Sequence, residues 1–262
     1  MKYLLLVLLL FLQFTDVMSQ HQLRILTYNI YHGENPYQTG KSITEEVGEF
    51  IRSINPDLVA LQEVDSMTLR TKAFAGKKLD LTNIWAEKTE MKGFFAKAID
   101  FSEGGYGEAV FSRFPVEFES IMLPTPKGGE GRSMAVAHVQ LEGGIKITFA
   151  GTHLCHEFVD NRSAQVRAII NYFKDYSHPV IVVGDFNFEA SEKGYSLMED
   201  AFFDAAKVSG QLKNTYPTDH PDIRIDYIWL MKNTEWKIDF FKVMEEIQYS
   251  DHLAVFAVVN FN

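Results

Sequence analysis

A carboxylate and a carboxamide follow the most apolar strand-like run in the chain. Residues Val180–Val183 are four consecutive β-branched residues, which favours a strand buried on both faces. Asp185 and Asn187 come shortly after this run, and because side chains alternate along an extended chain they point to the same side. Burying both groups beside a sheet costs free energy unless other polar groups pair with them. The segment therefore indicates either a site for phosphate and metal or an Asp/Asn turn that closes the strand.

Polar and ionisable residues also stand at the ends of the other apolar runs. Each alone has an ordinary explanation, since a carboxylate such as Glu63 is commonly a solvated strand end and His153 a hydrogen-bonded loop residue. Strand ends in α/β folds converge on one cleft, so the set as a whole predicts a single site. The set comprises Asn29, Glu63, His153, Asp185, Asn187, Asp226, Asp251 and His252.

Eight short motifs occur in a fixed order along the chain: TYNI, LQEVD, GEAVFSRFP, GRSMAVAHV, GTHL, VVGDFN, RIDYIWL and SDHLAV. This ordered series resembles the endonuclease/exonuclease/phosphatase superfamily, in particular its exported bacterial-type members, whose fold is similar to that of pancreatic deoxyribonuclease. The likeness runs from about Leu23 to Val259. It implies an α/β four-layer sandwich, in which two packed, mainly antiparallel β-sheets are flanked by helices.

The resemblance implies a divalent metal site. Glu63 resembles the family's principal Mg²⁺ ligand, with Asn29 and Asp251 beside it. Mg²⁺ is a hard cation that prefers oxygen ligands and keeps several waters, and a cluster of carboxylates and a carboxamide supplies such ligands. The expected cofactor is therefore Mg²⁺, with Mn²⁺ as the alternative.

The resemblance also implies catalytic roles near the phosphate. Asp185 resembles the residue that orients or deprotonates the attacking water, and Asn187 would bind a phosphate oxygen. His252 resembles the phosphate-contacting histidine, with Asp226 on its other ring nitrogen. A carboxylate in that position raises the imidazole pKa and favours the imidazolium, which suits the charge that develops on phosphorus oxygens.

A second carboxylate–histidine pair is expected from the same likeness. His153 resembles the other active-site histidine of the deoxyribonuclease branch, and Glu108 stands where its partner is expected. Such a pair would protonate the leaving oxygen or bind phosphate. The alternative for Glu108 is a solvated strand-end charge.

Substrate contacts are less sharply indicated. Arg132 matches a recurrent family arginine, and either a structural or a phosphate-contacting role suits it. His32 follows the first strand by one loop step, and Tyr106 aligns loosely with an active-site tyrosine, although most tyrosines are packing residues. Arg224 is expected to be structural. Cys155 and His156 lack the four-ligand spacing of a closed zinc site, so we expect no metal role for Cys155.

The elements that must position these residues follow from hydrophobic periodicity and turn signals. Helices are expected around Ile43–Ile54, within Met67–Lys92, at Asn161–Tyr176 and at Leu197–Val208, and a Gly-rich turn at Ser102–Gly107. The expected strands are Leu23–Tyr28, Leu58–Leu61, Gly93–Ile99, Ala109–Ser112, Val116–Leu123, Ser133–Leu141, Ile145–Thr152, Val180–Gly184, Ile223–Leu230, Trp236–Val243 and Leu253–Val259. Strands alternate with helices in places and form hairpins elsewhere, which is typical of a mixed sheet or two sheets in one domain.

Composition limits the location and the partners. Residues 1–19 have an early lysine, an unbroken apolar run at Leu4–Leu12 and small residues at Val17 and Ser19, which is a signal-peptide pattern. We therefore expect a periplasmic or secreted domain over residues 20–262. A membrane span needs roughly 20 apolar residues, and no run reaches that length. With one cysteine, no intrachain disulfide is expected, and we expect a monomer.

Charge and motifs together lead to one leading function and two alternatives. The 262 residues carry 25 Lys and Arg against 35 Asp and Glu, a net charge of −10, without a basic run that would favour nucleic acid. The leading hypothesis is an Mg²⁺-dependent phosphoric-ester hydrolase, most readily a phosphodiesterase on a small or lipid-headgroup substrate. The alternatives are an endonuclease acting on DNA or RNA and a non-catalytic phosphate-binding module.

Overall fold

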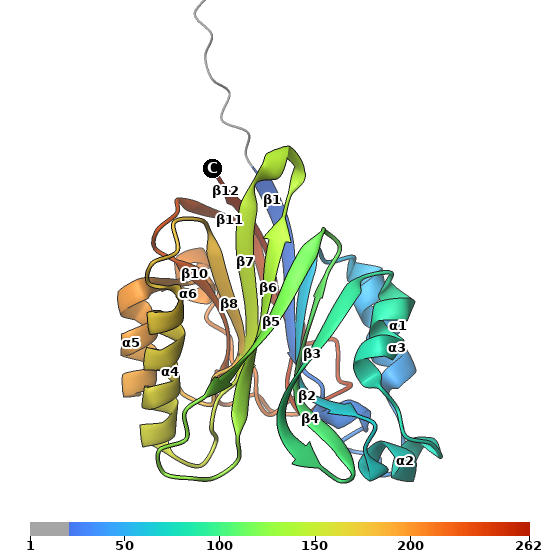
Figure 1. Ribbon diagram of the computed structural model, residues 1–262. Coiled ribbons are helices and arrows are strands. Elements are labelled where there is room, and N and C mark those ends of the chain that lie inside the picture. Colours follow the sequence, from blue (N-terminus) through green and yellow to red (C-terminus); the bar gives the residue numbers. More distant parts are fainter. Residues whose placement is uncertain (1–20) are drawn as a thin grey trace, which may run out of the picture.

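Two six-stranded β-sheets pack face to face in the computed structural model, which describes residues 21–262 (Figure 1). The first sheet has the strand order β11-β12-β1-β2-β4-β3, and the second has the order β5-β6-β7-β8-β10-β9. Helices cover the outer faces, so the four-layer α/β sandwich expected from the sequence is confirmed. The signal peptide predicted at residues 1–19 lies outside the described residues and stays a prediction.

The strand and helix bounds agree closely with hydrophobic periodicity. The strands of the first sheet are β1 (His21–Asn29), β2 (Leu58–Ser66), β3 (Lys92–Phe101), β4 (Gly104–Ser112), β11 (Trp236–Val243) and β12 (Val255–Phe261). Those of the second are β5 (Val116–Leu123), β6 (Arg132–Gln140), β7 (Lys146–His153), β8 (Val180–Asp185), β9 (Phe202–Asp204) and β10 (Asp226–Met231). The helices are α1 (Thr44–Ile54), α2 (Leu69–Ala75), α3 (Leu81–Thr89), α4 (Val159–Phe173), α5 (Lys193–Ala201) and α6 (Ala205–Ser209), with short 3₁₀ turns η1 (Tyr31–Gly33) and η2 (Glu142–Gly144).

Each sheet contains one parallel pair near its centre. β1 runs parallel to β2 and β7 runs parallel to β8, whereas the other neighbours are antiparallel. A parallel pair needs a crossover, which α1 supplies in the first sheet and α4 in the second. Parallel strands end at the same edge, so the carboxyl ends of β1 and β2 lie together, as do those of β7 and β8.

Three apolar clusters hold the layers together. The largest lies between the sheets and includes Ile181 and Val183, while Val180 and Val182 face the cluster beneath α4 and α5. All four residues are fully buried, which confirms the prediction of a strand covered on both faces. A third cluster packs α1 and α3 against the first sheet. Within residues 21–262 no helix combines the length and the apolar character needed to cross a bilayer.

Two local predictions were wrong. Only Ser102 and Glu103 form the turn expected at Ser102–Gly107, because β4 already begins at Gly104. The glycines serve close packing instead: a Cβ on Gly107 would lie 2.1 Å from the carbonyl oxygen of Ala96. The helix expected at Leu197–Val208 is interrupted by β9, which pairs with β10 and leaves two shorter helices, α5 and α6.

Gly184 determines how closely β7 and β8 approach beside Asp185. Its φ is +141°, and a Cβ would lie 1.9 Å from the carbonyl oxygen of Thr152. We expect Gly184→Ala to lower the free energy of unfolding by about 3 kcal/mol or more, because strain and a backbone clash add. Urea denaturation measures this. The matched control is Gly143→Ala, at φ +77° with no atom within 4 Å, which should cost about 1 kcal/mol; equal losses would contradict the prediction.

Candidate active site

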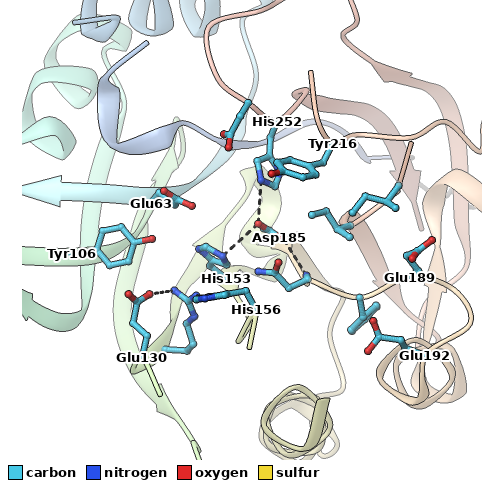
Figure 2. A pocket seen from close by; sticks show the side chains of 16 residues that line it. Glu63, Tyr106, Glu130, His153, His156, Asp185, Glu189, Glu192, Tyr216 and His252 are labelled. Atoms are coloured by element: carbon cyan, nitrogen blue, oxygen red, sulfur yellow. Dashed lines mark hydrogen bonds and ion pairs between the residues drawn. The ribbon is translucent and has the colours of Figure 1, made fainter. Parts of the chain in front are cut away.

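A cavity of about 420 Å³ opens where the carboxyl ends of the central strands meet (Figure 2). Half of its 16 lining residues were predicted from the sequence: Glu63, Tyr106, Arg132, His153, Asp185, Asn187, Asp251 and His252. The convergence of strand ends on one site is therefore seen in the structure. Asn29, Glu108 and Asp226 are buried, and two of them support the wall through hydrogen bonds to lining residues.

Asp185 is the buried centre of this site. Its Oδ1 accepts the backbone N–H of Asn187 at 2.9 Å, and its Oδ2 accepts from the Asn29 amide at 3.1 Å. The same Oδ2 lies 3.4 Å from His153 Nε2 and 3.6 Å from His252 Nε2. Burial raises the pKa of Asp185 to about 7, although the positive charge of His252 opposes the shift. The carboxylate can therefore exchange a proton near neutral pH.

His252 lies between two carboxylates. Its Nδ1 is 3.0 Å from Asp226 Oδ2, the pairing predicted from the sequence, and its Nε2 faces Asp185. Burial by itself would lower the pKa of His252, but Asp226 and Asp185 outweigh it and raise the pKa to about 10. The ring is consequently an imidazolium at neutral pH, a fixed cation beside the cavity. The Tyr216 ring packs against it, with the two ring centres 4.7 Å apart.

Glu63 occupies a strained position at the end of β2. It lies in a bulge between Leu61 and Val64 and has φ +62°, a conformation that is costly for a residue other than glycine. Asn29 donates to its carboxylate at 3.2 Å. Burial would raise the pKa of Glu63, but the neighbouring His32 ring, the Asn29 amide and the charge of His252 lower it to about 2. Glu63 is therefore an anion held at the cavity.

His32 takes a different place from the one expected. Its ring lies 3.4 Å from Glu34 and 4.0 Å from Glu63, and it is buried. It is absent from the described residues that line the cavity. His32 thus supports Glu63 from behind rather than contacting a substrate directly, and its strained φ of +48° in η1 shows how firmly it is held.

The predicted metal ligands fit a hard cation in part. Glu63, whose side chain is 21% exposed, and Asp251 both line the cavity. Asn29 turns its amide nitrogen toward the carboxylates and accepts the Tyr31 N–H with its oxygen, so ligation by that oxygen requires the amide to turn over. Carboxylates open to a cavity suit Mg²⁺ or Mn²⁺.

A tighter group also has the donor types that metals use. Asp185, Asp226 and His252 have ligand atoms within 4.8 Å of one another. These atoms already bind one another, because the imidazolium bridges the two carboxylates. Glu63 and Asp251 therefore offer carboxylates that are open to the cavity, whereas the ligand atoms of the tighter group are already paired with one another.

The second carboxylate–histidine pair is not formed. Within residues 21–262, both carboxyl oxygens of Glu108 and the Nδ1 of His153 lack a hydrogen-bond partner. Glu108 is fully buried, and burial raises its pKa well above the ordinary value, so it is a neutral acid rather than a solvated charge. Burial and Arg132 lower the pKa of His153 well below its ordinary value. A neutral His153 cannot serve as the acid for a leaving oxygen at neutral pH.

Arg132 and Tyr106 form one wall together with residues that were not predicted to belong to the site. Arg132 is 1% exposed and donates to Glu130 at 2.5 Å and to His156 at 3.1 Å. Tyr106 is buried, and burial raises its pKa well above 10. The lining residues missed by sequence reasoning are Glu130, His156, Phe188, Glu189, Glu192, Tyr216, Ile223 and Ile225. His156 carried the only usable signal, since it follows the GTHL motif by two residues.

The structural role expected of Arg224 is seen in its contacts, and Cys155 lies apart from the cavity lining. Arg224 makes a two-pronged ion pair with Asp204, at 2.7 and 3.1 Å, and lies over the Tyr227 ring, so it is structural. Cys155 is buried, and its sulfur contacts the Asn161 amide at 3.5 Å. Neither residue belongs to the cluster with metal-ligand geometry found in the described part of the chain.

Comparisons with known proteins bear on the family and the fold. The sequence profile of the Endonuclease/Exonuclease/phosphatase family matches residues 26–252. YbhP, an uncharacterized protein of Escherichia coli strain K12, is 26% identical over 230 residues, which cover 82% of this chain and 87% of YbhP. The mannosyl-6-phosphatase Bt3783 of Bacteroides thetaiotaomicron superposes with a TM-score of 0.71 at 16% identity, covering 92% of this chain and 99% of that one. The human Nocturnin catalytic domain with bound sulfate superposes with a TM-score of 0.71 at 22% identity, covering 92% of this chain and 95% of that one.

Asp226 is the main attraction that keeps His252 charged. We expect Asp226→Asn to lower the pKa of His252 from about 10, because the neutral amide no longer favours the imidazolium. Nitrogen-15 NMR titration of the histidine rings measures the shift. Asp239→Asn, on β11 and remote from the cavity, is the control and should leave His252 unchanged. An unaltered His252 titration in Asp226→Asn would contradict the assignment.

Glu108 should make stability depend on pH. Its pKa lies well above 4.5 in the folded protein and near 4.5 in the unfolded chain. Between the two pKa values the folded state holds a proton that the unfolded state has lost, so the free energy of unfolding falls as pH rises. Gln cannot ionise. We therefore expect the stability of Glu108→Gln, measured by urea denaturation, to gain on that of the native chain as the pH rises above about 4.5. The exposed Glu117→Gln is the control, and a difference independent of pH would refute the buried neutral acid.

Proposed function

Because the chain belongs to the Endonuclease/Exonuclease/phosphatase family, whose members are hydrolases acting on phosphoester bonds, we propose that it hydrolyses small phosphoric esters. We propose further that it is exported, that it depends on a divalent metal, and that phosphodiesters are its leading substrate class. The observation that carries the proposal is the contact set of Asp185. One buried carboxylate meets an imidazolium, a neutral histidine and an asparagine amide from distant segments, beside the anionic Glu63 in the same cavity.

Asp185 has the position and the pKa of a general base. Water beside it loses a proton to the carboxylate as the water oxygen attacks phosphorus. The bond between phosphorus and the ester oxygen then breaks, and the departing oxygen takes a proton from solvent. His252, as an imidazolium, stabilises charge on the nonbridging oxygens. Asn187 donates one amide hydrogen to the Leu154 carbonyl at 3.0 Å and keeps the second for a phosphate oxygen.

Glu63 and Asp251 are the residues that would hold the metal, with Asn29 completing the set if its amide turns. A bound Mg²⁺ or Mn²⁺ would supply charge stabilisation at the phosphate. The low pKa of Glu63 keeps a ligand ionised throughout the physiological range. Neutral His153 donates from Nε2 toward Asp185 and so orients the base rather than supplying a proton.

The cavity favours a small substrate. Its wall carries six carboxylates, from Glu63, Glu130, Asp185, Glu189, Glu192 and Asp251, against one arginine and the His252 imidazolium. Such a wall repels a long polyanion, whereas a metal neutralises enough charge to admit one phosphate group. A volume of about 420 Å³ also suits a small ester or a lipid headgroup. Since the structural relative Bt3783 is named a mannosyl-6-phosphatase, sugar phosphate monoesters belong in the same panel.

Two alternatives make different predictions. An endonuclease would cut plasmid DNA or RNA faster than small esters, against the charge of the cavity. A non-catalytic phosphate-binding module would bind phosphate without turnover. The second alternative is disfavoured because the general base, the imidazolium and the metal carboxylates are all present in one cavity.

We expect Glu63→Gln and Asp185→Asn each to lower kcat/KM by about 100-fold or more, because one removes a metal ligand and the other the base. Release of the alcohol from phosphodiesters and of phosphate from phosphomonoesters, each with Mg²⁺ or Mn²⁺ and beside a plasmid nicking assay, measures the effect. Circular dichroism checks folding, and Glu117→Gln on exposed β5 is the matched control. Full activity in either variant, or no turnover of any ester by the native protein, would refute the proposal.

A further inference from the structure

His156 is an exposed residue of the cavity wall whose ring is held from behind (Figure 2). Its Nδ1 lies 3.1 Å from Nη2 of Arg132, a guanidinium that is itself 1% exposed. The other end of that guanidinium donates to Glu130 at 2.5 Å. A chain of three residues therefore runs along the wall, and His156 is the member that faces solvent in the cavity.

The partner of Nδ1 determines where the ring proton is. A guanidinium has only donors, so Nδ1 of His156 must accept, and in the neutral ring the single proton then lies on Nε2. This N–H is the polar atom of the ring that the wall leaves free for a ligand. His156 thus differs from His252, whose two nitrogens both face carboxylates and which is charged.

The main chain at His156 is also held in place. Arg162 on α4 donates to the carbonyl oxygens of Cys155 and His156 at 3.0 and 3.1 Å, and it pairs with Glu192 at 2.7 Å. An exposed loop residue is ordinarily free to reorient. Here both the backbone and the ring are fixed by arginines, which is the preorganisation expected of a group that binds a ligand.

We propose that His156 is a specificity-determining residue that donates a hydrogen bond from Nε2–H to an oxygen of the phosphoester, and that Arg132 is the positioning residue that sets its tautomer. This rests on the proposed hydrolase function. Because Glu130 balances the charge of Arg132, the wall presents a directional neutral donor rather than a second cation. Such a donor suits an oxygen of the phosphate or a hydroxyl of the esterified alcohol.

The tautomer is tested without any substrate. Long-range proton–nitrogen NMR on the native, nitrogen-15-labelled protein should show His156 with Nδ1 unprotonated and Nε2 protonated, its signal being identified as the one missing from His156→Gln. Glu130→Gln, which keeps Arg132, should leave the pattern intact. A protonated Nδ1 at His156 would overturn the proposal whether or not the protein hydrolyses any ester.

Substrate contact is tested with side chains that place an amide at either ring nitrogen. The Gln amide nitrogen reaches the position of Nε2 and the Asn amide that of Nδ1. We expect His156→Ala and His156→Asn to lower kcat/KM by about three- to tenfold and His156→Gln to stay within about twofold of native, as for one neutral hydrogen bond. His138→Ala, on β6 outside the site, is the control. Equal activity in all three variants, or a loss in Gln as large as in Ala, would overturn the contact.

Inorganic phosphate distinguishes the two possible acceptors. If the contact is to the phosphate, His156→Ala weakens competitive inhibition by inorganic phosphate by the same factor as kcat/KM. If the contact is to the alcohol, phosphate inhibition is unchanged while kcat/KM still falls. Failure of the hydrolase proposal itself shows separately, as absent turnover in the native protein with an intact His156 tautomer.

Discussion

The structure depends on the burial of one carboxylate, Asp185, at the meeting point of two sheets. An unpaired carboxylate so deeply buried would be destabilising or would bind a proton. Here the Asn187 backbone, the Asn29 amide and two histidines surround it at 2.9 to 3.6 Å, and the balance leaves its pKa near neutrality. The partners come from both sheets, so the same contacts that relieve the buried charge also assemble the site.

The two-sheet architecture explains why such distant residues meet. Parallel pairing of β1 with β2 and of β7 with β8 places the carboxyl ends of two neighbouring strands together in each sheet. The apolar core between the sheets holds the two pairs of strand ends close to each other. The backbone is strained there: Tyr31, His32, Glu63 and Asn187 all have φ between +44° and +62°. Non-glycine residues hold that conformation only where the surroundings enforce it, and such positions concentrate at functional sites.

Three histidines around one cavity have different tasks because their neighbours differ. His252 faces two carboxylates and is a cation, whereas buried His153 lies near Arg132 and is neutral. His156 accepts from Arg132 and keeps its proton on the opposite nitrogen. One side-chain type therefore supplies a charge, an orienting contact and a neutral donor. Electrostatic environment, rather than residue type, separates these roles.

Local sequence determined the elements, because apolar periodicity and β-branched runs fix which backbone can be buried, as in the Val180–Val183 strand. The convergence of strand ends was predictable from the same pattern, and the Asp226–His252 pair from the family resemblance. Tertiary structure alone decided how the side chains of the site are oriented and paired, because these features depend on contacts between residues far apart in the chain. Packing directed the Asn29 amide nitrogen toward Asp185, left Glu108 and the Nδ1 of His153 without a hydrogen-bond partner in the described chain, and placed His32 behind Glu63. It likewise brought Arg132 to His156 and Tyr216 to His252. Which way Asn29 and His32 point, and whether Glu108 and His153 are ionised, depend on how the sheets pack, which is why residue types alone could not assign these roles.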